Sequence, residues 1–264
     1  MNWHEFLQSK SLLFKTSYAR APIYAKIVTH RITPYFVFFC MKLGITPDQV
    51  TLISVLVGWA SAVLFAVPSR VTVLLAALGL ELYYILDSVD GQLARITGKT
   101  SKTGAFFDIL LNYLVHPLPF LFIGLNQTFV TGNWIWTVGG ALAGLSYVWL
   151  GVTWNVRAHV LFDSLHEPGP AVSLENLEEE GEREKTARVS LPRRVFSFVH
   201  KLCTFPTAMN LITVTAVLKF LTGNLSLFRY LLGFYSVALP LVSLAKIGKM
   251  VLTREVDEEY ERRR

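Results

Sequence analysis

Long apolar stretches alternate with short polar connections along most of the chain. No Asp, Glu, Lys or Arg occurs between Ile109 and Val156, and the segments 49–69 and 230–245 also lack these residues. A membrane-spanning helix needs about 20 apolar residues, so the longest stretch is long enough for two crossings. The pattern predicts an integral membrane protein, because a soluble core would rarely require several such stretches.

The spacing of these stretches predicts six membrane-spanning helices. Thr46, Pro47 and Asp48 form a typical helix start, with a capping side chain, a proline in the first turn and an acid near the positive end of the helix dipole. Polar turns at 125–133 and 223–226 separate later pairs of helices. The expected spans are residues 47–67, 71–95, 103–125, 134–156, 203–222 and 229–250.

Three segments outside these spans differ in composition. Residues 1–44 are basic and aromatic, which predicts an N-terminal amphipathic helix at the membrane interface and a second short, partly inserted helix. Residues 160–194 are first acidic and then basic, as expected of a solvated loop. Residues 254–264 form a mixed-charge tail. The expected fold is therefore all-α, with a six-helix transmembrane domain over residues 45–253.

The 25 Lys and Arg residues give a net charge of +6 and a pI near 9.3. They do not form one patch, so the charge does not indicate a nucleic-acid partner. They gather in alternate connections, and the opposite connections hold only Arg70 and Arg229. The positive-inside rule therefore places both termini, with the connections 96–102 and 160–194, in the cytoplasm. A plasma, inner or endoplasmic-reticulum-type membrane fits this arrangement.

Acidic residues cluster where the second expected helix ends and the third begins. Asp87 and Asp90 share one helical face at i and i+3, and Asp108 lies on the returning helix after a short polar turn. Ionised carboxylates at this position are costly unless a cation neutralises them. Hard divalent ions prefer such oxygen ligands, and a pair of them could neutralise a pyrophosphate group. The cluster predicts a Mg²⁺ or Mn²⁺ site with two ions.

Small residues and one arginine accompany the acids. The segment 87–112 reads DSVDGQLARITGKTSKTGAFFDILLN. Its small residues Gly91, Ala94 and Gly104 would let a nucleotide approach the backbone closely. Arg95 would add a fixed positive charge for the phosphate groups.

This segment resembles the signature of the CDP-alcohol phosphotransferase (CDP-alcohol phosphatidyltransferase) family, D-x2-D-G-x2-A-R-x8-G-x3-D-x3-D. By this resemblance the metal ligands would be Asp87, Asp90 and Asp108. The residues at the CDP group would be Asp87, Gly91, Ala94, Arg95 and Gly104.

The resemblance also implies the reaction. A substituted phosphate would move from a CDP-linked alcohol or CDP-diacylglycerol donor to an alcohol acceptor, with release of CMP. The product would be a phospholipid or related lipid, and the protein would be a homodimer among membrane lipids with its active site facing the cytoplasm.

The last position departs from the signature, because Asn112 stands where the family has an Asp as general base and metal ligand. An amide oxygen can ligate a cation but cannot accept a hydroxyl proton near neutral pH. Either another base replaces it, or the chain is a non-catalytic relative, or an active enzyme was inactivated by engineering. His116, one turn beyond Asn112 on the same face, is the nearest replacement base. It could equally be a polar residue satisfied inside the bundle.

Two basic residues, Arg157 and Lys201, flank the fourth and fifth expected helices on the cytoplasmic side. Each could bind the acceptor or serve as an ordinary flanking charge. The main alternative to an enzyme is a non-catalytic membrane protein that binds CDP-linked lipid, which Asn112 would explain. A transporter fits less well, because its polar residues should lie near the bilayer midplane and here they gather at one surface.

Overall fold

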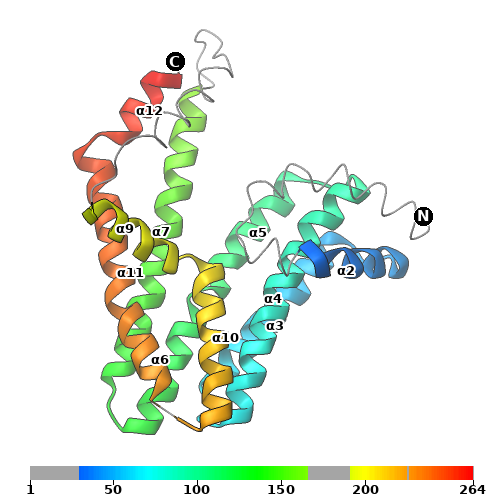
Figure 1. Cartoon of the computed structure of the whole chain (residues 1–264). Helices are drawn as coiled ribbons and strands as arrows, with labels where there is room; N and C mark the ends of the chain where they lie inside the picture. The colour runs from blue at the N-terminus through cyan, green and yellow to red at the C-terminus, as the bar shows by residue number, and fades with distance from the viewer. Residues whose placement is uncertain (1–29, 166–190, 225, 264) are drawn as a thin grey trace.

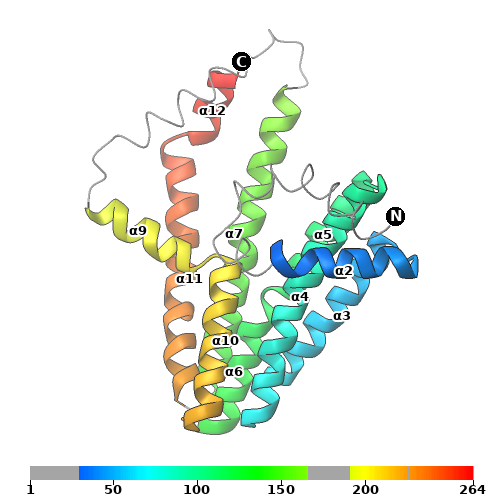
Figure 2. The same cartoon turned by 45° about the vertical axis from the view of Figure 1, so that its right-hand side comes forward.

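The structure, a computed structural model, describes residues 30–165, 191–224 and 226–263, and within these ranges the regular structure is entirely helical. Figures 1 and 2 show the helices from two directions. The helices are α2 (His30–Leu43), α3 (Pro47–Phe65), α4 (Arg70–Thr97), α5 (Lys102–Val115), α6 (Leu118–Thr131), α7 (Ile135–Leu165), α9 (Leu191–Leu202), α10 (Phe205–Thr222), α11 (Leu227–Leu252) and α12 (Glu255–Arg263).

Six helical segments of the described chain are long and apolar enough to span a membrane. They cover residues 47–65, 70–97, 102–131, 135–161, 205–222 and 227–252. The predicted all-α fold with six spans is thereby confirmed. The N-terminal amphipathic helix was predicted within residues 1–44, of which residues 1–29 lie outside the described residues. The described remainder contains α2, which lies across the ends of α3 and α4 (Figure 2).

The third span consists of two helices, where the sequence pattern predicted a single one over residues 103–125. α5 ends at Val115, and α6 begins at Leu118. Pro117 lies between them, and its nitrogen carries no hydrogen to donate to a preceding carbonyl group. The helical hydrogen bonding is therefore interrupted inside the membrane segment.

The polar turn predicted at residues 125–133 lies partly inside α6, which continues to Thr131. Asn126 is 2% exposed, and its amide nitrogen donates to the carbonyl oxygens of Phe65 and Val67, each at 2.9 Å. Carbonyl groups at the end of a helix lack partners within that helix. The polar residue that suggested a turn therefore caps the end of α3.

The fourth span is also longer than predicted. α7 continues to Leu165 instead of ending near residue 156. The predicted loop 160–194 thus begins inside a helix, and its part at residues 166–190 lies outside the described residues. The predicted C-terminal tail 254–264 contains the helix α12.

Small residues allow α6 and α7 to approach each other closely. A Cβ atom at Gly140 would lie 2.4 Å from the carbonyl oxygen of Phe120, and one at Gly124 would lie 2.5 Å from that of Trp136. Larger side chains would push the two backbones apart. Such contacts are typical of helix pairs in membranes, where close packing replaces the hydrophobic effect.

Lys219 is fully buried near the last turn of α10, and its Nζ has no hydrogen-bond partner among the described residues. The ammonium lies 5.3 Å from the centre of the Phe228 ring, which offsets only part of the cost of burying a charge. We expect Lys219→Met to raise the free energy of unfolding by about 1–3 kcal/mol. The lost attraction to the helix C-terminus is worth at most about 1 kcal/mol.

Thermal unfolding in detergent checks this expectation. Lys42 is the matched control, because it lies 5.1 Å from the Phe38 ring but is exposed. Lys42→Met should leave the melting temperature nearly unchanged. A melting temperature lowered by Lys219→Met would show that the buried ammonium stabilises the fold.

Candidate active site

A tight turn brings the end of α4 beside the start of α5. Gly98 closes α4 with a φ of 66°, in the left-handed region that glycine adopts at little cost. Ser101 then caps α5, its side-chain oxygen accepting a hydrogen bond from the Gly104 nitrogen at 2.9 Å. Because only residues 98–101 separate the helices, the end of α4 and the start of α5 lie at the same end of the bundle (Figure 1).

A cavity of about 210 Å³ opens between α3, α4 and α5 at this turn. Six of the predicted site residues line it: Asp90, Gly91, Ala94, Arg95, Gly104 and Asp108. The rest of the lining comes from α3, the turn and the first turn of α5, and it was not predicted: Pro47, Asp48, Thr51, Lys99, Thr100, Ser101 and Ala105.

Asp90 is held by α3 as well as by its own helix. Asp90 is 5% exposed, and its Oδ2 accepts a hydrogen bond from the Thr51 hydroxyl at 2.6 Å. Its Oδ1 accepts a second one from the Gly91 nitrogen at 2.5 Å. These contacts fix the carboxylate at the wall of the cavity. No sequence pattern indicated Thr51, because 39 residues separate the two partners along the chain.

Asp108 is linked to Asn112 one turn further along α5. The amide nitrogen of Asn112 donates to Asp108 Oδ1 at 3.1 Å. An ionised carboxylate only accepts hydrogen bonds, so this contact fixes the orientation of the amide group. The amide oxygen then faces Tyr83, whose hydroxyl donates to it at 2.5 Å. Asn112 is therefore engaged on both sides.

His116 lies deeper in the bundle, among aromatic side chains. Its Nε2 lies 2.9 Å from the Tyr83 hydroxyl, and its Nδ1 lies 3.4 Å from that of Tyr147. Its ring stacks on Phe205 with 3.6 Å between the ring centres. His116 is absent from the cavity lining. Its link to the site runs through Tyr83 and Asn112.

Asp87 does not line the cavity either. Its carboxyl group lies close enough to those of Asp90 and Asp108 to interact with them electrostatically. Within the described residues, no three His, Cys, Asp or Glu side chains form a group that is already arranged to hold a metal ion. The donor types nevertheless fit a hard divalent cation, because carboxylate, hydroxyl and amide oxygens are the ligands that such ions prefer.

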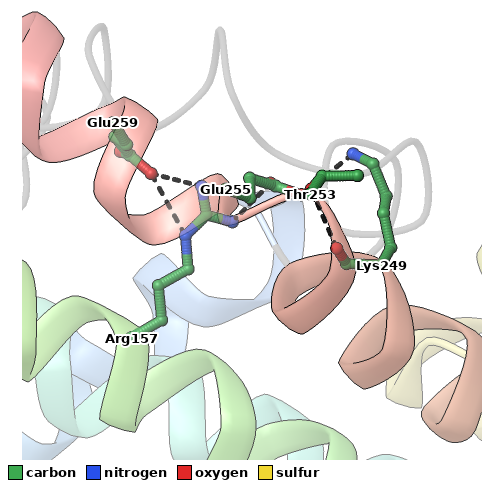
Figure 3. A network of polar contacts seen from close by, with 5 residues as sticks. All are labelled: Arg157, Lys249, Thr253, Glu255 and Glu259. Carbon is green, nitrogen blue, oxygen red and sulfur yellow. Dashed lines mark hydrogen bonds and ion pairs between the residues drawn. The ribbon is translucent and has the colours of Figure 1, made fainter.

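Arg157 is bound by the C-terminal helix instead of facing the cavity. Its guanidinium group contacts Glu255, with 3.1 Å between Nη1 and Oε1, and donates from Nε to Glu259 at 3.1 Å (Figure 3). Lys249 donates to Glu255 from α11, and this bond holds the pKa of that carboxyl group below its usual value. The amide nitrogen of Asn155, two residues before Arg157, donates to the Tyr113 hydroxyl on α5. Side chains two positions apart on a helix differ in direction by about 200°. Arg157 therefore points away from α5.

Lys201, the second candidate for acceptor binding, is exposed on α9. Neither Lys201 nor Arg157 lines the cavity. The structure therefore gathers the motif residues of α4 and α5 but does not bring these two cations to them.

Residues 44–173 match the family model described as CDP-alcohol phosphatidyltransferase. This match assigns the segment 44–173 to the CDP-alcohol phosphatidyltransferase family. This confirms the resemblance that the motif indicated. The matched segment contains the whole cavity lining described above.

Two curated proteins show the same relationship. Archaetidylinositol phosphate synthase of Pyrococcus horikoshii is 40% identical over 73 residues, which are 28% of this chain and 37% of the relative. Phosphatidylinositol phosphate synthase of Streptomyces avermitilis is 34% identical over 89 residues, 34% of this chain and 36% of the relative. The chain thus matches little more than a third of the length of these CDP-alcohol phosphatidyltransferase relatives.

A solved structure shares the fold over a longer stretch. The crystal structure of Mycobacterium tuberculosis phosphatidylinositol phosphate synthase with CDP-DAG bound has a TM-score of 0.57 and 14% sequence identity. The similarity covers 83% of this chain and 92% of that chain. The helical arrangement is therefore common to both proteins.

Proposed function

We propose that the chain is a membrane-bound CDP-alcohol phosphotransferase, with residues 45–253 as its catalytic domain. It transfers a substituted phosphate group from a CDP-linked donor to an alcohol hydroxyl group and releases CMP, in the synthesis of phospholipids or related lipids. The observation that carries this proposal is the cavity, which gathers two motif aspartates, the small motif residues and Arg95 on its walls.

Three aspartates are proposed as ligands of divalent cations, Asp87, Asp90 and Asp108. Mg²⁺ or Mn²⁺ bound there would neutralise phosphate oxygens of the donor. Thr51 keeps the Asp90 carboxylate at the cavity wall. Asn112 does the same for Asp108 by donating to it from α5.

The remaining motif residues are proposed to bind the CDP group. A Cβ atom at Gly91 would lie 3.6 Å from the Arg95 guanidinium, so this cation lies over the smallest part of the wall. A Cβ atom at Gly104 would lie 3.0 Å from Ser101 Oγ, where it would crowd the cap of α5. Arg95 and Lys99 add positive charge for phosphate groups at the cavity.

The residues predicted for the base and for the acceptor lie outside the cavity lining. Asn112 cannot act as a general base. Because the Tyr83 hydroxyl donates its proton to Asn112, His116 Nε2 donates to Tyr83, and the histidine would have to change tautomer before it could take up a proton through this hydroxyl. These contacts also support the alternative role of a satisfied polar residue. An acceptor at Arg157 would have to replace Glu255 and Glu259 as its partners. These contacts favour, as the second candidate function, a protein that binds CDP-linked lipid without turnover.

Measuring CMP release and donor binding by the purified protein separates the two functions. The donors to compare are CDP-diacylglycerol and a water-soluble CDP-alcohol, each with phosphorylated and unphosphorylated inositol as acceptors in the presence of Mg²⁺. Release of CMP supports the enzyme. Metal-dependent binding of the donor without CMP release supports the binding protein, and the absence of both refutes the proposal.

The proposed orientation places the active site on the cytoplasmic side, together with both termini, and a homodimer completes the proposal. Lys99 and Asn133 are exposed and belong to the α4–α5 and α6–α7 connections. These two connections lie at opposite ends of the bundle (Figure 1). We expect Lys99→Cys to react with an impermeant thiol reagent from the cytoplasmic side of oriented vesicles, and Asn133→Cys to react from the other side. Background reaction should be low, because Cys40 and Cys203 are both buried. Labelling of both variants from one side would contradict the topology.

A further inference from the structure

An apolar groove of about 750 Å³ runs along the outer face of α11 below α9. α9 contributes Val195, Phe196 and Val199 to its lining. α11 contributes the other residues, which are Phe234, Val237, Ala238, Leu241, Val242 and Ala245. No residue of the groove lines the cavity at α4 and α5. The two sites therefore lie on different helices.

The depth of the groove matches one leaflet of a bilayer. α9 crosses α11 at the level of the bundle where α10 begins, as both views show (Figures 1 and 2). The lining of α11 extends from Phe234 to Ala245, which at 1.5 Å per residue corresponds to about 16 Å. The hydrocarbon core of a bilayer is about 30 Å thick, so the groove spans about half of it.

α9 is built to lie at the membrane surface. Its apolar side chains occupy one arc of the helix and its basic side chains the opposite arc, the pattern of an interfacial amphipathic helix. Arg194 and Lys201 belong to the basic arc and are exposed. The carbonyl oxygen of Leu202 accepts a hydrogen bond from Tyr235 at 3.0 Å, which fastens α9 to α11.

Lys246 supplies a positive charge at the upper rim of the groove, beside the imidazole of His200. Lys246 directly follows the last lining residue, and its ammonium lies 5.8 Å from the centre of the Trp154 ring. Burial lowers the pKa of His200 on α9, and the nearby Lys246 ammonium lowers it further. Neither α9 nor α11 contains an Asp or Glu residue. The rim can therefore attract an anion at the surface while the groove accepts an apolar chain below it.

We propose that this groove binds an anionic phospholipid of the surrounding membrane, separate from the CDP-linked donor. The phosphate group lies at Lys246 and His200, and one acyl chain fills the groove between α9 and α11. A zwitterionic lipid fits the apolar part equally well but gains less from the basic rim, because each Lys or Arg near an anionic lipid surface contributes about 1 kcal/mol.

Native mass spectrometry of the full chain in mild detergent tests this proposal without any CDP-linked donor, so its result is independent of the proposed reaction. Phosphatidylglycerol and phosphatidylcholine with identical acyl chains are the probes. We expect tighter binding of phosphatidylglycerol, a loss of about fivefold in its affinity for Lys246→Gln, and recovery of that affinity for Lys246→Arg. Lys42→Gln, on the other interfacial helix, is the matched control.

The groove itself is tested by filling it. Val237 is 59% exposed in the groove, and Leu75 is 53% exposed on α4, away from the groove. Val237→Trp should weaken the binding of both lipids, whereas Leu75→Trp should not. Equal binding of the two lipids by the parent, or equal effects of Lys246→Gln and Lys42→Gln, would overturn the proposal. So would a dimer that Val237→Trp dissociates without any change in lipid binding, because a second copy would then be the occupant.

Discussion

Asp90→Asn is expected to abolish the Mg²⁺- or Mn²⁺-dependent binding of a CDP-linked ligand and to lower CMP release by more than about 100-fold. The amide has nearly the shape of the carboxylate, so Thr51 can keep its contact with the oxygen of the side chain. What the substitution removes is the negative charge that a divalent cation requires. The two readouts are donor affinity with and without metal ion, and the rate of CMP release.

The same cavity supplies a matched control for this prediction. Asp48 also lines the cavity but stands outside the motif. Asp48→Asn removes the same charge from the same site and is expected to have a much smaller effect. Metal-dependent binding that survives in Asp90→Asn, or an equal loss in Asp48→Asn, would remove Asp90 from the proposed ligand set.

Asn112→Asp is expected to raise CMP release by about 10²–10⁴-fold, the usual contribution of a general base, with little change in donor affinity. Tyr83 can still donate to the new carboxylate, as it does to the amide oxygen. The hydrogen bond from residue 112 to Asp108 is lost, however, and two carboxylates then face each other. The variant should therefore unfold at a lower temperature than the parent without divalent ions and recover when Mg²⁺ is added.

His116 offers the competing explanation, and the same assay separates the two. If His116 replaces the missing base, the parent turns over at an ordinary rate, His116→Gln costs about 100-fold or more, and Asn112→Asp gains little. Asn112→Leu is the control for shape, because leucine has nearly the shape of asparagine but provides neither a hydrogen-bond donor nor a base. A demonstrably active parent that neither Asn112→Asp nor His116→Gln affects would place the base elsewhere.

The parts of the fold that depend on local composition could be predicted from the sequence. Long apolar stretches with few or no charged residues locate the six spans, because the bilayer disfavours unpaired charge whatever the tertiary structure is. Ends of helices could be misplaced, because polar side chains also serve neighbouring helices. Asn126 suggested a turn, yet it caps α3, 59–61 residues away along the chain.

In the candidate site, too, features that depend on local sequence could be predicted, and features that depend on neighbouring helices could not. The i, i+3 spacing of Asp87 and Asp90 is a property of one helix, and a short turn suffices to bring Asp108 near them. The hydroxyl of Thr51 could not be predicted, because its place depends on how α3 packs against α4. The charge of Arg157 is evident from the sequence, but the direction of its side chain depends on the helix that carries Glu255 and Glu259.

The break at Pro117 makes α5 a short separate helix. The two helices that carry the site aspartates, α4 and α5, therefore have different surroundings. Asp90 lies on α4, which packs on α3 and α10 inside the protein. Asp108 lies on α5, where Val115 is the only buried residue of the 14 and most apolar side chains face outward. One wall of the cavity is thus held by packing within the chain, whereas the helix of the other wall presents most of its apolar side chains outward. The distance between these two aspartates therefore depends on what covers α5, which is either the bilayer or the second copy of the proposed homodimer.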